Sequence, residues 1–171
     1  MKIIFLDIDG VMNSRESLLA LRKGTNLKEI SDMNPHSHHV DILNHIIDQT
    51  GAKVVISSVW RHRNTPFMLW RLLAAYGFKG EVLDKTPRYS DLCRGDEIAI
   101  WLNLQQRLHK RYKGDNNLFY RNYQEPIESF VILDDSSDMQ ELIEFLVQTK
   151  SETGLLMEHA EKAIKILNKG K

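Results

Sequence analysis

The sequence predicts an α/β protein built on a Rossmann-like, doubly wound parallel sheet. Three short apolar runs, at residues 3–6, 52–56 and 130–133, are rich in β-branched residues and end in polar residues. Runs of this length and composition are typical of strands that are buried on both faces of a parallel sheet. Longer segments with helical spacing separate the runs, and this alternation favours right-handed crossovers between parallel strands.

Four segments have the apolar spacing of amphipathic helices. They cover residues 40–47, 67–76, 98–108 and 160–167. Gly51 follows the first helix and Gly77 follows the second, and glycine is the residue that most often ends a helix. Two shorter apolar runs, at residues 81–83 and 145–147, indicate further strands.

We expect a single domain over residues 1–171, a length that suits one hydrophobic core. Two stretches, 14–37 and 113–125, lack clear periodicity, and irregular stretches this long are usually functional or disordered. The first could form a small flap or lid, with Leu18, Leu19 and Leu21 on its apolar side.

The bulk composition excludes some classes of function. Lys plus Arg and Asp plus Glu both count 23, so the net charge of zero argues against a generally basic nucleic-acid coat. Cys93 is the only cysteine, which rules out an intrachain disulfide and fits a reducing compartment. The apolar run at 3–6 is too short for a signal peptide or a membrane span. We therefore expect a cytoplasmic protein without a membrane partner.

Polar side chains follow each of the three main runs. They are Asp7 and Asp9 after the first, Ser57, Ser58 and Arg61 after the second, and Asp134 and Asp135 after the third. Ligands of open parallel sheets bind beyond the carboxyl ends of the strands, so these residues should meet at one edge.

The residue types at this edge indicate phosphoryl chemistry. Crowded carboxylates repel one another unless a cation balances them, and a set without histidine or cysteine favours the oxygen-binding ion Mg²⁺. Serine hydroxyls and an arginine are suitable donors to a phosphoryl group. A carboxylate that is free to attack would complete a site for phosphoryl transfer to aspartate.

The order of these motifs resembles the haloacid dehalogenase (HAD) superfamily, and in particular the phosphatase-like domain of Swiss-army-knife RNA repair proteins. The resemblance rests on residues 6–11, 56–61, 94–98 with Trp101 and Leu102, 133–135, 147–149 and 153–155. It implies that Asp7 is the nucleophile and a Mg²⁺ ligand. It implies that Asp9 is the general acid and base and ligates Mg²⁺ through its backbone carbonyl. Ser57 would bind the phosphoryl group, Asp134 would ligate Mg²⁺, and Asp135 would do so directly or through water.

The third motif of the superfamily is usually a lysine. Here Arg94, just before the helix at 98–108, is the first candidate, with Lys85 and Arg88 as alternatives. Arginine supplies the charge, although its broad fork differs from a lysine ammonium.

The acid at Asp9 favours hydrolysis of a phosphomonoester, because superfamily members without it include the dehalogenases and P-type ATPases. The intervals between motifs are too short for a large cap domain, and an open site would admit a phosphorylated nucleic-acid end, a nucleotide or a phosphoprotein. A basic cluster (Arg107, Lys110, Arg111 and Lys113), together with the aromatic residues Tyr112, Phe119, Tyr120 and Tyr123 and with Arg121, predicts polynucleotide contact near the site.

Two other interpretations agree less well with the order of the motifs. A receiver-like signalling domain also uses clustered aspartates and Mg²⁺, but its phosphorylated aspartate follows the third strand. A catalytically idle interaction module would not need the intact acidic motifs. His36, His38 and His39 are expected to be exposed residues at a helix start, not metal ligands.

Overall fold

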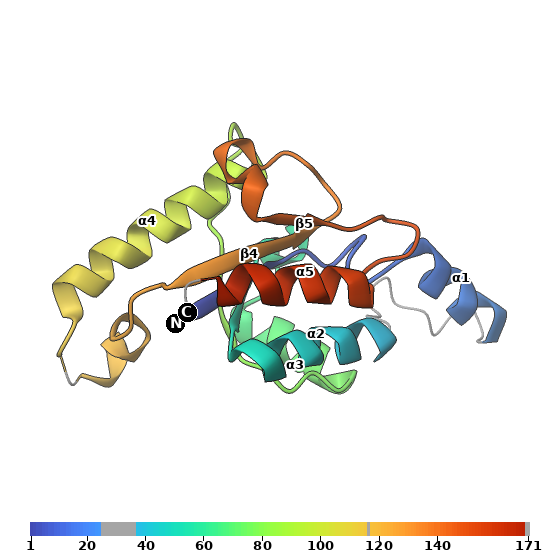
Figure 1. Ribbon diagram of the computed structural model, residues 1–171, viewed down its shortest axis with the longest axis horizontal. Coiled ribbons are helices and arrows are strands. Elements are labelled where there is room, and N and C mark those ends of the chain that lie inside the picture. The colour runs from blue at the N-terminus through green and yellow to red at the C-terminus, as the bar shows by residue number, and fades with distance from the viewer. Residues whose placement is uncertain (25–36, 116, 170–171) are drawn as a thin grey trace.

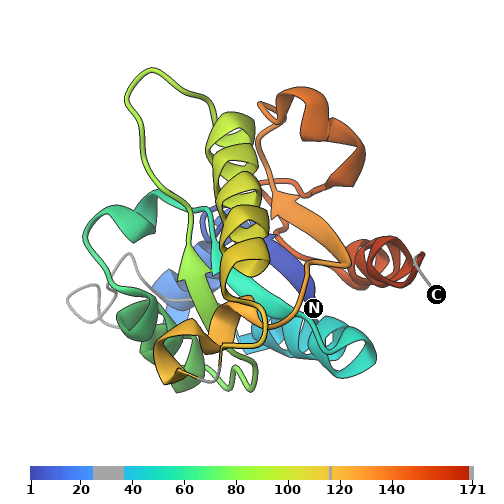
Figure 2. The ribbon, with the colours of Figure 1, turned by 90° about the vertical axis from the view of Figure 1, so that its left-hand side faces the viewer.

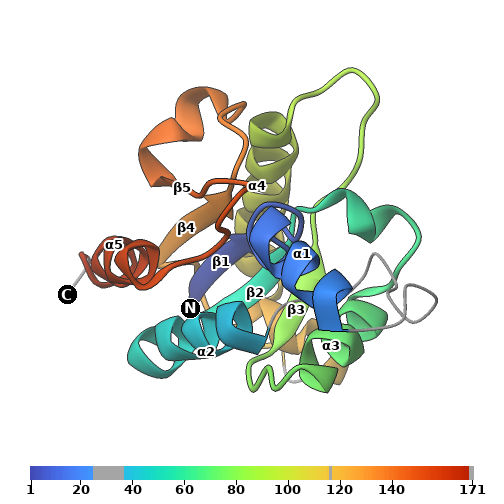
Figure 3. The same cartoon turned by 90° about the vertical axis from the view of Figure 1, so that its right-hand side faces the viewer.

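The computed structural model describes residues 1–24, 37–115 and 117–169. Its sheet has five parallel strands in the order β3-β2-β1-β4-β5, which confirms the predicted fold class (Figures 1 and 3). The strands are β1 (Lys2–Leu6), β2 (Lys53–Ile56), β3 (Val82–Lys85), β4 (Ser129–Asp134) and β5 (Leu146–Gln148). All five correspond to the apolar runs expected from the sequence.

Helices cover both faces of the sheet. They are α1 (Arg15–Gly24), α2 (Ser37–Thr50), α3 (Pro66–Ala75), α4 (Arg94–Tyr112) and α5 (Met157–Asn168), with 3₁₀ helices η1 (Val59–His62), η2 (Leu118–Tyr123) and η3 (Gln140–Phe145). Figure 1 shows α4 on one face and α2, α3 and α5 on the other. Among the helices that the structure describes, none has the length and apolar character needed to cross a bilayer.

Two apolar clusters hold the layers together. The larger lies between the sheet and α2, α3 and α5, and includes the inward side chains of Leu43, Leu73 and Ala163. The smaller lies under α4 and η3, where Trp101 packs edge-on against Phe5. Ring centroids 5.4 Å apart at an interplanar angle of 86° are a favourable aromatic arrangement. The smaller cluster fixes α4 against the sheet, and α4 carries a residue of the candidate site.

The helix ends follow local sequence signals. Gly51 has a φ of 67° after α2, as expected of a glycine that ends a helix. The Thr65 side chain accepts a hydrogen bond from the Met68 backbone N–H and Pro66 opens α3. Helix α4 begins four residues earlier than its apolar spacing indicates, because the acidic side chains of Asp96 and Glu97 form its polar first turn.

Part of the predicted lid is helical. Helix α1 begins at Arg15 after Ser14 and Ser17 exchange hydrogen bonds between backbone N–H and hydroxyl. Figure 3 shows α1 at the carboxyl edge of the sheet, in front of β1. Residues 25–36, which include the rest of the predicted lid and His36, lie outside the described residues, as does the side chain of Leu21. The described chain contains no large cap domain.

Candidate active site

The carboxyl ends of the three central strands are level with one another. Leu6 of β1 pairs with Ile56 of β2 and with Leu133 of β4. The residues that follow are tied across the same ladder, since the Asp7 N–H donates to the Leu133 carbonyl and the Ser57 N–H donates to the Leu6 carbonyl, both at 3.0 Å. This register brings Asp7, Ser57 and Asp134 to one edge.

Three carboxylates form a cluster at this edge. One oxygen each from Asp7, Asp134 and Asp135 lie within 4.8 Å of one another. Asp7 is 5% exposed and Asp134 is fully buried. Gly10 makes room for Asp135, because a Cβ atom at Gly10 would lie 2.2 Å from the Asp135 Oδ2 atom. The Gly10 φ of 76° also favours glycine at this position. The aspartates have the spacing and the hard oxygen donors that suit Mg²⁺.

Arg94 lies between two of these carboxylates. Its Nη1 atom is 2.8 Å from an Asp7 oxygen and 2.6 Å from an Asp134 oxygen. Gly95 lets the start of α4 approach so closely, since a Cβ atom there would lie 2.3 Å from the Met139 carbonyl oxygen. The first turn of α4 thus delivers the basic group to the cluster.

The two alternatives for the third motif lie elsewhere. The Lys85 ammonium donates to the carbonyls of Arg61 and Asn64, at 2.8 and 2.9 Å. Arg88 is exposed and contacts no aspartate of the cluster by any ion pair of the described residues. Of the three candidates, Arg94 is the one that forms ion pairs with the aspartate cluster among the described residues.

Burial dominates the electrostatics of the cluster. Loss of water and the neighbouring charge of Asp7 together raise the pKa of Asp134 to about 7, despite the opposing effect of Arg94. The same two causes raise the pKa of Asp135. Burial opposes the charge on Arg94, but Asp7 and Asp134 outweigh it and raise the pKa of the guanidinium. The single positive charge of Arg94 cannot balance three carboxylates, so a divalent cation would relieve the remaining repulsion between them.

Asp9 lies apart from the cluster, on the exposed side of the same loop. The Trp60 indole N–H donates to one carboxylate oxygen at 2.8 Å, and the Asn13 side-chain amide donates to the other at 3.2 Å. Trp60 belongs to η1 after β2, so two motifs meet at this carboxylate. The position of Trp60 in the second motif is the signal in the sequence that could have indicated this polar contact.

The two serines have different environments. Ser57 is fully buried, and no described group forms a hydrogen bond with its hydroxyl oxygen. A buried polar atom without a partner is costly, which is consistent with a hydroxyl reserved for a ligand. The Ser58 hydroxyl instead accepts from the Trp60 backbone N–H at 3.5 Å and caps η1. Ser58 therefore has a structural contact where a substrate contact was predicted.

The sequence predicts that Arg61 binds substrate, whereas the structure directs its side chain to groups of the protein itself. Its guanidinium is 4% exposed and spends its donors on the carbonyls of Ser57, Ser58, Thr86 and Pro87 and on the Glu97 carboxylate. Burial lowers the pKa of Arg61, while Glu97 opposes that shift. Because an arginine has only five N–H donors, this pattern leaves none for a phosphoryl group. Arg61 fixes the backbone that carries Ser57.

Histidine and threonine side chains fasten the loop that carries Asp7 and Asp9. The Thr149 hydroxyl donates to the Gly10 carbonyl at 2.7 Å. The two ring nitrogens of His39 lie 2.9 Å from the Met12 carbonyl and 3.1 Å from the Thr153 carbonyl. His39 is buried, which corrects the expectation of an exposed helix-start residue, whereas His38 is exposed as expected.

The basic cluster lies at the other end of α4. Arg94 opens the helix and Arg107 to Lys113 close it, so roughly 20 Å or more of helix axis separates them. Figure 2, viewed from the opposite edge of the sheet, shows the end of α4 beside η2. The aromatic rings of Tyr112 and Tyr120 stack on each other at 3.9 Å. The prediction that this segment lies near the site is wrong, because a crossover helix runs away from the carboxyl edge.

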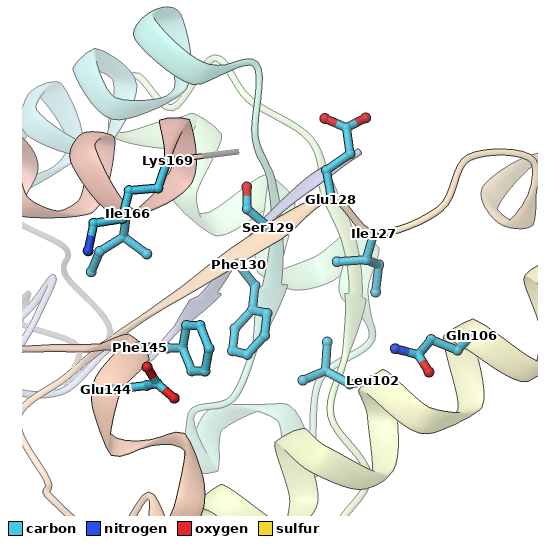
Figure 4. Close-up of a pocket in the computed structure, with 10 residues that line it drawn as sticks. All are labelled: Leu102, Gln106, Ile127, Glu128, Ser129, Phe130, Glu144, Phe145, Ile166 and Lys169. Atoms are coloured by element: carbon cyan, nitrogen blue, oxygen red, sulfur yellow. The ribbon is translucent and has the colours of Figure 1, made fainter. Parts of the chain in front are cut away.

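A larger hollow, of about 480 Å³, lies at that opposite edge. Figure 4 shows it between α4, the start of β4, η3 and the end of α5. Its apolar part comes from residues such as Leu102, Phe130 and Phe145. It contains none of the predicted site residues, so size alone does not locate the chemistry in this molecule.

Comparison with known proteins identifies the family. The sequence matches the family described as "HAD domain in Swiss Army Knife RNA repair proteins" over residues 3–160. No curated protein and no solved structure matches the chain significantly. The match covers every strand end described above, and a HAD domain implies a phosphatase-type hydrolase. The chain therefore belongs to the family of HAD domains found in Swiss Army Knife RNA repair proteins.

Proposed function

We propose that the protein is a Mg²⁺-dependent phosphomonoester hydrolase that works through an aspartyl-phosphate on Asp7. The observation that carries this proposal is the arrangement around Asp7. Its carboxylate shares a buried cluster with Asp134 and Asp135, and Arg94 contacts it at 2.8 Å. A nucleophile, metal-binding carboxylates and a cation for the phosphoryl oxygens are thus adjacent.

The residues of the cluster fit Mg²⁺. Asp7, Asp134 and Asp135 offer oxygen ligands within 4.8 Å of one another, and the backbone carbonyl of Asp9 is a further expected ligand. When bound, Mg²⁺ would neutralise charge on the phosphoryl oxygens and orient the group for in-line attack. It would also counteract the burial and the repulsion by Asp7 that together raise the pKa of Asp134 to about 7.

The first half of the reaction transfers the phosphoryl group to the protein. An Asp7 carboxylate oxygen attacks phosphorus, and the bond between phosphorus and the leaving oxygen breaks. Asp9 donates a proton to that oxygen, so the alcohol leaves neutral. The Arg94 guanidinium and the unpartnered Ser57 hydroxyl stabilise the phosphoryl oxygens.

The second half restores the protein. Asp9, now a carboxylate, takes a proton from a water molecule whose oxygen attacks phosphorus. The bond between phosphorus and the Asp7 oxygen breaks, and inorganic phosphate leaves. The hydrogen bonds from Trp60 and Asn13 keep the Asp9 carboxylate in one orientation through both steps. A general acid and base of this kind typically contributes about 10²–10⁴-fold in rate.

The substrate class that we propose is a phosphorylated nucleic-acid end or a nucleotide. The description of the family refers to RNA repair, and the described residues include no large cap that would exclude a polymer. A phosphoprotein substrate and an idle interaction module are the outcomes that a substrate panel must exclude.

The test is a panel of phosphomonoesters with Mg²⁺, including nucleotides, oligonucleotides with 3′- or 5′-phosphates, and phosphopeptides. The wild-type protein should release phosphate from a nucleotide or an oligonucleotide end, and chelation of the metal should stop it. Asp7→Asn should fold normally and lose activity by more than about 10⁴-fold. Retained turnover in Asp7→Asn, or no turnover of any substrate by folded protein with Mg²⁺, would overturn the proposal.

A further inference from the structure

A second, smaller pocket adjoins the aspartate cluster. It has a volume of about 200 Å³, and we call it the Arg88 pocket. Its charged and titratable lining residues include Arg61, His62, Arg88, Arg94, Glu97 and Asp138. Arg94 belongs both to this pocket and to the cluster, so the pocket begins where the proposed phosphoryl site ends. A group bound in it would lie beside the reacting phosphate.

Two of the three arginines in the Arg88 pocket are already paired with carboxylates. Arg61 pairs with Glu97, whose other oxygen accepts from the Tyr89 backbone N–H at 2.8 Å. Arg94 pairs with carboxylates of the cluster. Asp138 accepts a hydrogen bond from the Ser136 hydroxyl at 2.7 Å. Among the described residues, no carboxylate forms an ion pair with Arg88.

His62 lies in a positively charged part of the pocket. Loss of water lowers its pKa, and the positive charges of Arg88 and Arg61 lower it further. The ring is therefore a neutral hydrogen-bond donor at neutral pH, next to a cation without a partner. An anion with several oxygens suits this combination, because Arg88 can supply charge and two parallel N–H donors.

We propose that the Arg88 pocket binds a second phosphate of the substrate, next to the phosphomonoester that is hydrolysed. This inference rests on the proposed function and narrows it to substrates that carry two neighbouring phosphates. A nucleoside bisphosphate and the terminal phosphodiester of a polynucleotide end share this chemistry. We therefore expect the selection of doubly phosphorylated substrates to depend on residues close to Asp7, and not on the basic cluster at the end of α4.

The experiment compares matched substrates that differ by one phosphate. The first pair is a nucleoside 3′-monophosphate and the corresponding 3′,5′-bisphosphate. The second pair is a nucleoside 3′-monophosphate and a dinucleotide that ends in a 3′-phosphate, and the same two pairs are made with the 5′-phosphate as the terminal group. The measured quantity is the ratio of kcat/KM within each pair. Wild type, Arg88→Ala, Arg88→Lys and the control Arg107→Ala are compared at two salt concentrations.

Arg88→Ala should lower the ratio for the doubly phosphorylated substrates by about tenfold, because one charge-assisted phosphate contact is lost. Arg88→Lys should restore part of it, and Arg107→Ala should leave it as in wild type. Of the three variants, only Arg88→Ala should bind the doubly phosphorylated substrates with a weaker salt dependence than wild type. If Arg88→Ala lowers the ratio for the dinucleotide, the second phosphate belongs to a polynucleotide end. If it lowers the ratio for the bisphosphate only, the second phosphate belongs to a free nucleotide.

An unchanged ratio in Arg88→Ala, or an equal loss in Arg107→Ala, would overturn the inference. Failure of the proposed function is distinguishable, since it would abolish turnover of every substrate in the wild type. In that event the dissociation constants of the mono- and bisphosphates still test the pocket. Wild type should then bind the bisphosphate about tenfold more tightly than Arg88→Ala does, and equal affinities would contradict the inference.

Discussion

The two ends of α4 carry similar residue types and have different environments. At the first turn, Arg94 contacts two buried carboxylates at the carboxyl edge of the sheet. At the last turn, Arg111 lies over the ring of Tyr112 at 5.2 Å, and Tyr112 stacks on Tyr120. Arg94 thus contacts the aspartate cluster, whereas the side chains of the last turn contact one another and the ring of Tyr120 in η2. Position in the topology, not residue type, separates the two.

Substitution of Asp9 tests the site beside the first turn of α4. Its expected effect on turnover is second only to that of substituting Asp7. Asp9→Asn should lower turnover of an alkyl phosphomonoester by about 10²–10⁴-fold, because the amide cannot donate a proton to the leaving oxygen. Steady-state rates on alkyl and nitrophenyl phosphates measure this. The loss should be smaller for the nitrophenyl ester, whose leaving group needs no proton. Equal losses for both esters would argue against the acid role.

A substitution of Arg61 separates structure from catalysis near the same end. Arg61→Ala leaves Glu97 buried without its partner, and a broken buried pair costs about 3–5 kcal/mol. Urea unfolding should show this loss in the free energy of unfolding. Arg94→Ala should instead retain more stability and lose more activity, because it is the arginine that faces Asp7. The reverse ranking would mean that the two arginines have been assigned the wrong roles.

Mg²⁺ should stabilise the folded protein through the aspartate cluster. At a free concentration of 100 times its dissociation constant, a ligand that binds only the folded state adds about 2.7 kcal/mol. Thermal unfolding with and without Mg²⁺ measures the shift in Tm. Asp135→Asn should reduce the shift, whereas Asp138→Asn, a matched change of a nearby exposed aspartate, should preserve it. A shift that survives in Asp135→Asn would place the ion elsewhere.

Trp60 should act through Asp9. Trp60→Phe keeps an aromatic ring and removes the indole donor, so it should lower turnover of alkyl phosphates by about tenfold. As with Asp9→Asn, the effect on the nitrophenyl ester should be smaller. A uniform reduction for both esters would indicate that Trp60 contributes only packing.

The far end of α4 should give the smallest effect. Neutralising Lys110, Arg111 and Lys113 together should change kcat/KM on an oligonucleotide 3′-phosphate by less than about twofold, because these residues lie roughly 20 Å or more from Arg94. A loss similar to that expected for Arg88→Ala would show that the nucleic acid extends along the helix, and the contrast between the two ends would fail.

The strands and their order of motifs could be predicted because buried strands have a short, apolar signature. Runs such as 3–6 and 130–133 mark β1 and β4 directly, and the residues after them lead to the aspartate cluster. The start of α4 was harder to predict, since Gly95 and an acidic first turn do not resemble an apolar stripe. Its position depends on a close approach to Met139, which is a tertiary contact.

The two arginines show where sequence reasoning stops. Arg61 and Arg94 both belong to motifs at strand or helix ends, and nothing in their spacing indicates that one is enclosed by carbonyls while the other faces carboxylates. The location of the basic cluster, in contrast, could have been predicted. A helix that connects two parallel strands runs antiparallel to them, so its last turn lies at the opposite edge from the site.

The aspartyl-phosphate on Asp7 is the central claim, and its direct test is chemical trapping. The protein is quenched during turnover of a substrate with Mg²⁺, treated with borohydride and digested, and the peptide that contains residue 7 is sequenced by mass spectrometry. Reduction of an acyl phosphate should convert this aspartate to homoserine in the wild type and not without substrate. Trapping at another aspartate, or none during measured turnover, would contradict the account.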